Sequence, residues 1–194
     1  MASTWTARAW ARADLLCARF PVVWALTSAG FKGALGDQIA QRFVEGKSDT
    51  DLRRTAVYTT FSGLYLGGVQ YFVQCRLLEH LFPGRSAIAV VKKVCVDQFV
   101  HLPFLAFPCL YLIKETFMPN NKVDPSQSIL NRSLEKYRQE AKEVNIALWK
   151  FWIPATTVGF AVIPTHWRIP YNSGLSLAWT IILSNMQARL DSEG

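Results

Sequence analysis

The chain has 194 residues, of which 51% are hydrophobic, and its formal net charge is +7. Only 18% of the residues are charged, whereas a soluble domain carries roughly a quarter. Lys and Arg stand at the borders of apolar stretches and do not gather into one basic stripe. This distribution disfavours a nucleic-acid surface, so no nucleic-acid binding is expected, and it favours the loops of a membrane protein.

The apolar stretches are long. Residues 55–75 and 169–188 contain no charged side chain, and each reaches the length of about 20 residues that a helix needs to cross a hydrocarbon core. Residues 20–43 reach this length only if Lys32 and Asp37 are tolerated. We therefore predict an all-α integral membrane bundle of about four transmembrane helices plus an amphipathic interfacial helix. A soluble all-α protein with buried core helices is the alternative.

The N-terminal segment, residues 1–19, is basic, with Arg8, Arg12 and Arg19 against the single acid Asp14. Basic and hydroxylated segments that are poor in acids are typical of mitochondrial targeting sequences. The alternative is a basic anchor that stays on the protein at the membrane surface. The segment favours a mitochondrial over a peroxisomal location.

Three apolar helices are expected next, over residues 20–43, 52–82 and 86–117. Pro21 suits the first turn of a helix, where its missing N–H would have no partner in any case. In lipid, helices pack by close approach of their backbones over small residues. The residues expected at such contacts are Gly30, Gly33 and Gly36 in the first helix and Gly63 and Gly67 in the second.

The third connection differs in character from the apolar helices. Over residues 124–150, apolar side chains alternate at spacings of three and four with charged ones, which predicts an amphipathic helix with Asp124 as its N-cap. This helix is expected to lie in the membrane interface or on the end of the bundle. A bent or re-entrant element over 151–167 and a last membrane helix over 169–187 complete a single membrane domain, residues 20–190.

Charged and amide side chains recur within the apolar helices. Lys32 precedes Asp37 and Gln38 by the same spacing that separates Lys92 from Asp97 and Gln98, which indicates a weak internal repeat. A charge at mid-membrane depth costs about 2.5–3.5 kcal/mol on insertion scales, so such residues face the bundle interior and usually pair. They are either structural ion pairs or the lining of a hydrophilic path for solutes. The candidates are Lys32, Asp37, Gln38, Gln41, Lys93, Asp97, Gln98 and Arg168, with Lys32 and Lys93 as partners of the carboxylates.

No catalytic or metal-binding pattern is visible. The three His and four Cys residues have no metal-ligand spacing, and no nucleophile elbow or phosphate-binding loop is found. We expect neither an enzyme, nor a cofactor, nor a metal site.

These motifs together resemble the family of Mpv-seventeen and peroxisomal membrane protein PMP-twenty-two. The resemblance runs from about Phe20 to Ser184 and is most specific in the stretch 92–103 and in the closing signature, to which Trp152, Phe160, Pro164 and Trp179 belong. The chain departs from the signature where the family has a Gln and an Asn, because Thr156 and Gly159 stand there.

The resemblance implies a small four-span protein of the mitochondrial inner membrane or, alternatively, the peroxisomal membrane. It further implies a channel-like protein that passes small metabolites with low selectivity and supports organelle homeostasis. The rival hypothesis is a non-conducting structural or adaptor protein that recruits partners through its amphipathic helix. The expected partners are the lipid bilayer and small solutes, and a homo-oligomer is compatible with either hypothesis.

Overall fold

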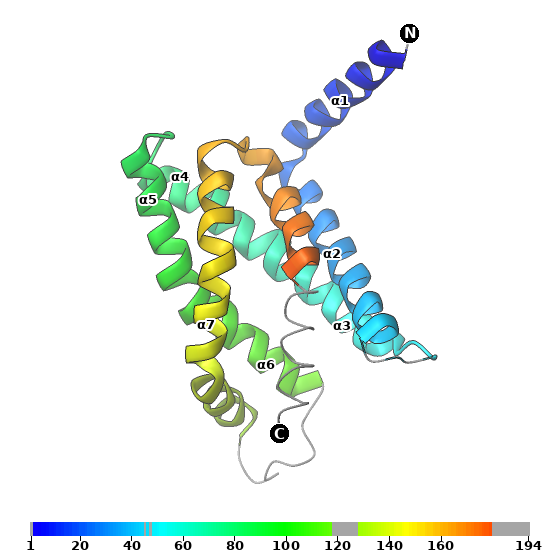
Figure 1. Cartoon of the computed structure of the whole chain (residues 1–194), viewed down its shortest axis with the longest axis vertical. Coiled ribbons are helices and arrows are strands. Elements are labelled where there is room, and N and C mark those ends of the chain that lie inside the picture. Colours follow the sequence, from blue (N-terminus) through cyan, green and yellow to red (C-terminus); the bar gives the residue numbers. More distant parts are fainter. Residues whose placement is uncertain (1, 45, 47, 118–127, 180–194) are drawn as a thin grey trace.

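The computed structural model describes residues 2–44, 46, 48–117 and 128–179, and the regular elements in these ranges are all helices. The basic N-terminal segment forms α1 (Ala2–Arg19), which projects from a bundle of long helical rods (Figure 1). The predicted all-α class is therefore confirmed for the described residues.

Three rods follow α1 in chain order. The first joins α2 (Pro21–Ile39) to the π-helical turn η1 (Ala40–Val44). The second joins α3 (Leu52–Phe61), the π-helical turns η2 (Ser62–Val69) and η3 (Phe72–Leu77), and α4 (Leu78–Leu81). The third joins α5 (Ala87–Val96), the π-helical η4 (Asp97–Ala106) and α6 (Phe107–Phe117). The three predicted apolar helices are confirmed to within one residue at each end.

Local sequence explains where the rods begin. Pro21 occupies the first turn of α2. The Asp51 carboxylate caps α3 by accepting a hydrogen bond from the backbone N–H of Arg54 at 3.0 Å, and the Ser86 hydroxyl caps α5 in the same way. These caps satisfy N–H groups that have no partner inside the helix. Gly84 has a φ of 84°, which lets the chain turn between the second and third rods.

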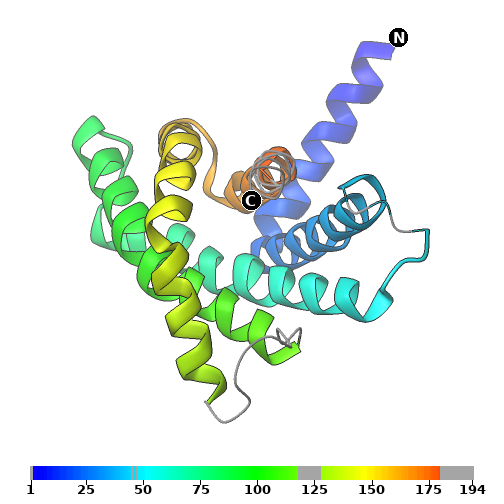
Figure 2. The ribbon, with the colours of Figure 1, turned by 60° about the horizontal axis from the view of Figure 1, so that its bottom comes forward.

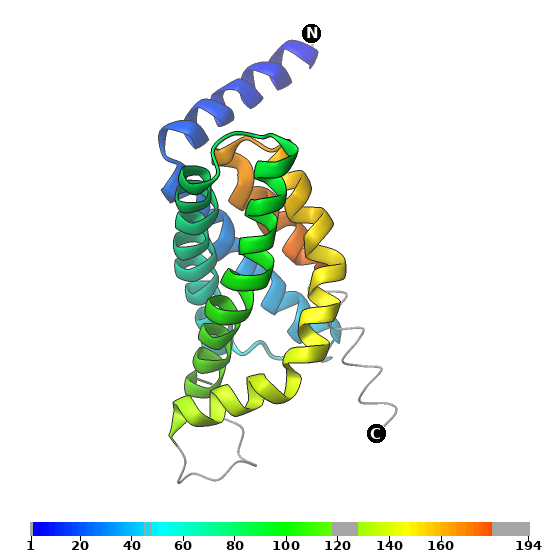
Figure 3. The ribbon, with the colours of Figure 1, turned by 90° about the vertical axis from the view of Figure 1, so that its left-hand side faces the viewer.

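The fourth long helix, α7 (Ile129–Ala161), has 33 residues and corrects the prediction for this region. It begins with Ser128 as its N-cap; the predicted cap Asp124 lies outside the described residues. The amphipathic helix predicted over 124–150 and the bent or re-entrant element predicted over 151–167 are not separate elements, because one helix continues through Pro154 to Ala161. A proline inside a long helix is accommodated by bending. Figure 3 shows the first turns of α7 running across the bottom of the bundle before the helix turns upward.

After α7 the chain reverses through a short 3₁₀ turn, η5 (Thr165–Trp167), into a helix that the structure describes from residue 168 to 179. This helix runs between α2 and α7 (Figure 2). The remainder of the predicted last helix lies outside the described residues, as does the predicted end of the domain at residue 190.

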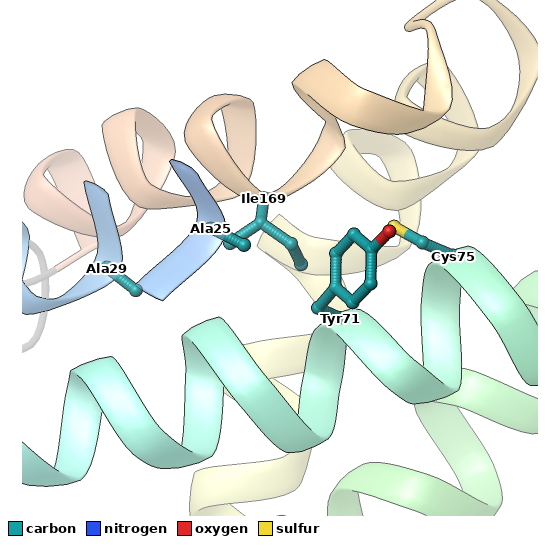
Figure 4. Packing of buried hydrophobic residues seen from close by; sticks show 5 residues of the cluster. All are labelled: Ala25, Ala29, Tyr71, Cys75 and Ile169. Carbon is teal, nitrogen blue, oxygen red and sulfur yellow. The ribbon is translucent and has the colours of Figure 1, made fainter. Parts of the chain in front are cut away.

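The first two rods pack closely along a seam of small residues. A Cβ on Gly67 would lie 2.5 Å from the Cα of Leu26, and a Cβ on Gly33 would lie 2.6 Å from the Ser62 hydroxyl oxygen. Gly30 and Gly63 face each other at ordinary contact distances, whereas Gly36 is buried beside the cavity described below. Above the seam, the two rods share a cluster with the helix that begins at residue 168, made of Ala25, Ala29, Tyr71, Cys75 and Ile169 (Figure 4).

The distribution of polar and apolar side chains is the one expected in lipid. Phe31 and Phe104 are 71% and 76% exposed, whereas Lys93, Asp97 and Arg168 are at most 1% exposed. Charged residues in membrane bundles face inward in this way. Among the described residues one helix, Ala87–Phe117, has the length and the mean hydropathy, 1.4, of a membrane span. The four-span arrangement remains a prediction.

Candidate functional site

The three rods, α7 and the helix that begins at residue 168 line a central cavity of about 640 Å³. This volume lies in the range of small-molecule sites. Four of the charged and amide candidates from the sequence line it, namely Lys32, Asp37, Asp97 and Gln98. Aromatic side chains form much of the remaining wall, and they are Tyr58, Phe61, Tyr65, Phe107, Trp152 and Trp179.

Asp37 is the centre of a hydrogen-bonded cluster at the cavity. Its carboxylate forms an ion pair with the Arg54 guanidinium, with Nε and Oδ1 2.8 Å apart. It also accepts hydrogen bonds from the Gln41 amide and the Thr55 hydroxyl, each at 2.6 Å. The Gln38 amide in turn donates to the Thr55 oxygen at 3.0 Å. The cluster ties the end of α2 to the beginning of α3.

Lys32 differs from the prediction, because it does not pair with Asp37. The side chain lines the cavity and is half-buried. No hydrogen bond or ion pair joins Lys32 to any residue that the structure describes. The Lys32 ammonium therefore faces the cavity without a hydrogen-bonding or ion-pair partner among the described residues.

Asp97 is the centre of a second cluster, deeper in the bundle. Its carboxylate contacts the His101 Nδ1 at 3.0 Å and accepts hydrogen bonds from the Gln74 and Gln98 amides, each at 3.1 Å. The other nitrogen of His101 lies 3.5 Å from the hydroxyl of Tyr65. The two clusters share a local pattern, since each aspartate binds the side chain four residues later, as the sequence repeat suggested.

Lys93 and Arg168 meet at a third site and do not line the cavity. They share one carboxylate, because Lys93 lies 2.7 Å from one oxygen of Glu79 and Arg168 lies 2.9 Å from the other. The Lys93 ammonium also donates to the carbonyl of Gly84 at 2.8 Å, and both cations stand over the Phe160 ring. The expectation that Lys93 pairs with Asp97 is therefore wrong. We refer to Glu79, Lys93 and Arg168 as the buried ion triad.

The closing signature takes different places around these sites. Trp152 and Trp179 line the cavity, and Phe160 packs beneath the buried ion triad. Pro164 precedes η5, where its carbonyl accepts the backbone N–H of Trp167 at 2.9 Å. Residues of the signature thus line the cavity, pack against the buried ion triad and precede the turn η5.

The N-terminal helix α1 is tied to η5 through Asp14. The carboxylate lies 2.7 Å from the His166 Nε2 and accepts a hydrogen bond from the indole N–H of Trp167 at 2.8 Å. These hydrogen bonds, first that of His166 and then that of Trp167, lower the pKa of Asp14. Asp14 therefore joins the basic segment to the turn η5.

Several residues that complete these sites were not identified from the sequence. Arg54 lies in the first turn of α3, and Asn172 lies within the closing signature, between Pro164 and Trp179; both line the cavity. Lys114, which stands beside Glu115 near the end of the third apolar helix, was a usable signal and lines the cavity too. Gln74 and Glu79 gave no signal in the sequence. A single amide side chain within a helix, like Gln74, is common, and so is an acidic side chain just after an apolar stretch, like Glu79. Within the described ranges no group of three metal-binding side chains occurs.

The comparisons with known proteins are consistent with one another. A family model described as the Mpv17 / PMP22 family matches residues 127–184. PXMP2/4 family protein 2 of Dictyostelium discoideum is 27% identical over 175 residues, which are 86% of this chain and 84% of that protein. Protein SYM1 of Mycosarcoma maydis is 28% identical over 158 residues, 81% of this chain and 75% of that protein. Mitochondrial inner membrane protein Mpv17 of Danio rerio is 25% identical over 180 residues, 90% of this chain and 94% of that protein. No solved structure matches.

Proposed function

Because the chain belongs to the Mpv17 / PMP22 family, we propose that it passes small solutes across an organelle membrane through its central cavity. It is an organelle membrane protein, and its location is the mitochondrial inner membrane, as the family resemblance implied. The proposed partners are the surrounding bilayer and the solutes themselves, and no catalytic role is proposed.

The central cavity is the observation that carries this proposal. It measures about 640 Å³ and brings charged side chains from three rods to one space inside an apolar exterior. Each buried charge costs about 2.5–3.5 kcal/mol on insertion scales. Structural ion pairs account for the buried ion triad, but they do not account for Lys32, which has no partner among the described residues. A hydrophilic path for solutes accounts for both the cavity and its charge.

The proposed membrane arrangement follows the rods. The rods over 21–44, 52–81 and 87–117 each exceed the length of about 20 residues that spans a hydrocarbon core. The helix that begins at residue 168 supplies the proposed fourth crossing. The beginning of α7, with its charged side chains, lies at the membrane surface in this arrangement, and the rest of α7 forms part of the cavity wall.

The proposal is tested by size-graded solute release from proteoliposomes. Wild type is compared with Asp37→Asn, which removes the ion-pair partner of Arg54 at the cavity wall. The matched control is Asp49→Asn, an exposed aspartate in the loop before α3. We expect release with a sharp upper size limit that Asp37→Asn changes and Asp49→Asn leaves unchanged. Circular dichroism checks that each variant is folded. No release of any solute from inserted, helical wild type would refute the proposal.

A non-conducting adaptor is the second candidate, and the first turns of α7 favour it. Ile129, Leu130 and Leu134 are exposed there, between charged side chains, and this is the composition of a surface that binds a partner or the membrane interface. Replacing Leu130 and Leu134 with serine distinguishes the two functions. An adaptor loses its partners in crosslinking while insertion is normal, whereas a channel keeps its solute release.

A further inference from the structure

The charges that line the central cavity do not balance. Three cations face it, namely Lys32, Arg54 and Lys114, against two carboxylates, Asp37 and Asp97. In a small cavity of low dielectric, a single excess charge dominates the electrostatic potential. The sign of this excess bears on which solutes enter.

Both carboxylates are already engaged by other groups. Asp37 forms its ion pair with Arg54 at 2.8 Å, and its other oxygen accepts two further hydrogen bonds. Asp97 contacts His101 at 3.0 Å and accepts the Gln74 and Gln98 amides. Neither carboxylate therefore forms an ion pair with a lysine.

The two lysines therefore carry the uncompensated positive charge. In the part of the chain that the structure describes, neither Lys32 nor Lys114 forms a hydrogen bond or an ion pair. Lys114 is attracted by Glu140 but repelled by Arg54 and Lys136, and the Glu140 carboxylate already accepts the hydroxyl of Tyr111. Removing an ammonium from water is unfavourable unless an anion meets it.

We propose that the cavity binds and admits small organic anions, with the carboxylate or phosphate group at Lys32 and Lys114. The inference rests on the proposed function and deepens it by naming the class of solute. The body of the anion packs against aromatic side chains such as Phe61, Tyr65 and Trp152, which line the same cavity. Lysine suits this role because its ammonium is a compact charge that attracts an anion without fixing its orientation.

The test uses three solutes that share a four-carbon chain: succinate, erythritol and 1,4-diaminobutane. They differ chiefly in charge, so release from proteoliposomes of pure phosphatidylcholine reports selectivity rather than size. We expect wild type to release succinate about tenfold faster than the diamine, at the lower end of the range for a cleft lined by one sign of charge. The Lys32→Gln, Lys114→Gln double variant removes this difference. Lys150→Gln, a control at an exposed position outside the cavity, keeps it.

Binding is measured separately, as the shift in thermal unfolding that succinate causes in detergent. If succinate stabilises wild type and Lys150→Gln but not the double variant, the anion site exists even where no solute is released, and only the channel proposal fails. Equal release of the three solutes by wild type would overturn the inference while leaving the channel intact. A preference for succinate that survives in the double variant would also overturn it.

A lipid headgroup is the competing source of the anionic group, and the same variants distinguish it. If phosphatidylglycerol stabilises wild type but not the double variant, and succinate stabilises neither protein, the site binds lipid. This result would overturn the inference of a soluble anion. If neither succinate nor the lipid stabilises any variant and no solute is released, the anion site and the proposed function both fail.

Discussion

Replacing Gly67 with alanine tests the packing on which the bundle depends. The new Cβ would lie 2.5 Å from the Cα of Leu26 and 2.7 Å from the carbonyl oxygen of Ala25. Ordinary van der Waals contact begins at 3.4 Å. All three of the nearest atoms belong to the backbone of α2, so no side chain can rotate away, and the two rods must separate.

The neighbouring glycine provides an internal control for this prediction. A Cβ on Gly68 would meet only the end of the Leu26 side chain, at 3.7 Å. Overpacking costs about 1–3 kcal/mol, and backbone contacts place Gly67→Ala at the upper end. Gly68→Ala gains up to about 1 kcal/mol from the higher helix propensity of alanine. The two alanine variants should therefore differ by about 2–4 kcal/mol in the free energy of unfolding.

The measurement is a denaturation of both variants in detergent micelles by sodium dodecyl sulfate, followed by tryptophan fluorescence. We expect the midpoint to fall for Gly67→Ala and to hold or rise for Gly68→Ala. Equal midpoints for the two variants would show that α2 and the second rod do not approach each other as closely as the structure has them, and the reasoning would be refuted.

Three further predictions concern the charged groups. Because the pKa of Asp14 is lowered, its contact with His166 stabilises the attachment of α1 above pH 3.8, the ordinary pKa of an aspartate, and this stabilisation is lost as the pH falls further. Limited proteolysis should therefore cleave α1 more readily at low pH. Asp14→Asn should make α1 equally easy to cleave at neutral pH. Glu79→Gln leaves two buried cations without their carboxylate and should lower stability by about 3–5 kcal/mol, whereas the exposed Glu135→Gln should change the unfolding midpoint little. Lys32→Met should raise stability by about 1–2 kcal/mol, because it removes an unpaired ammonium; a lowered midpoint would reveal a partner for Lys32.

The helical rods were predictable because their signals are local. The uncharged stretch 55–75 and the proline at position 21 are both read from adjacent residues in the sequence. Signals of this kind predicted the ends of the rods to within one residue. The continuity of α7 was not predictable, since Pro154 breaks many helices and the sequence alone does not tell whether a long helix bends around a proline.

The pairing of the buried charges was predicted less well than their burial. Lys32 lies five residues before Asp37, so the two do not share a face of α2, and the actual partner, Arg54, comes from the next helix. Side chains on a helix lean toward its N-terminus. Lys93 therefore reaches back toward Glu79 at 2.7 Å and away from Asp97. Which side chain of another helix becomes the partner depends on how the two helices are rotated about their axes and shifted along each other. A local sequence pattern carries no information on either.

The continuity of α7 has a mechanical consequence. Its first turns are held to α6 through the ion pair of Arg132 and Glu115 at 3.0 Å, and further along the same helix Leu148, Trp152 and Thr156 form part of the cavity wall. A helix transmits displacement along its axis because its hydrogen bonds resist stretching. A displacement of the charged first turns of α7 should therefore also move the part of the cavity wall that the same helix forms.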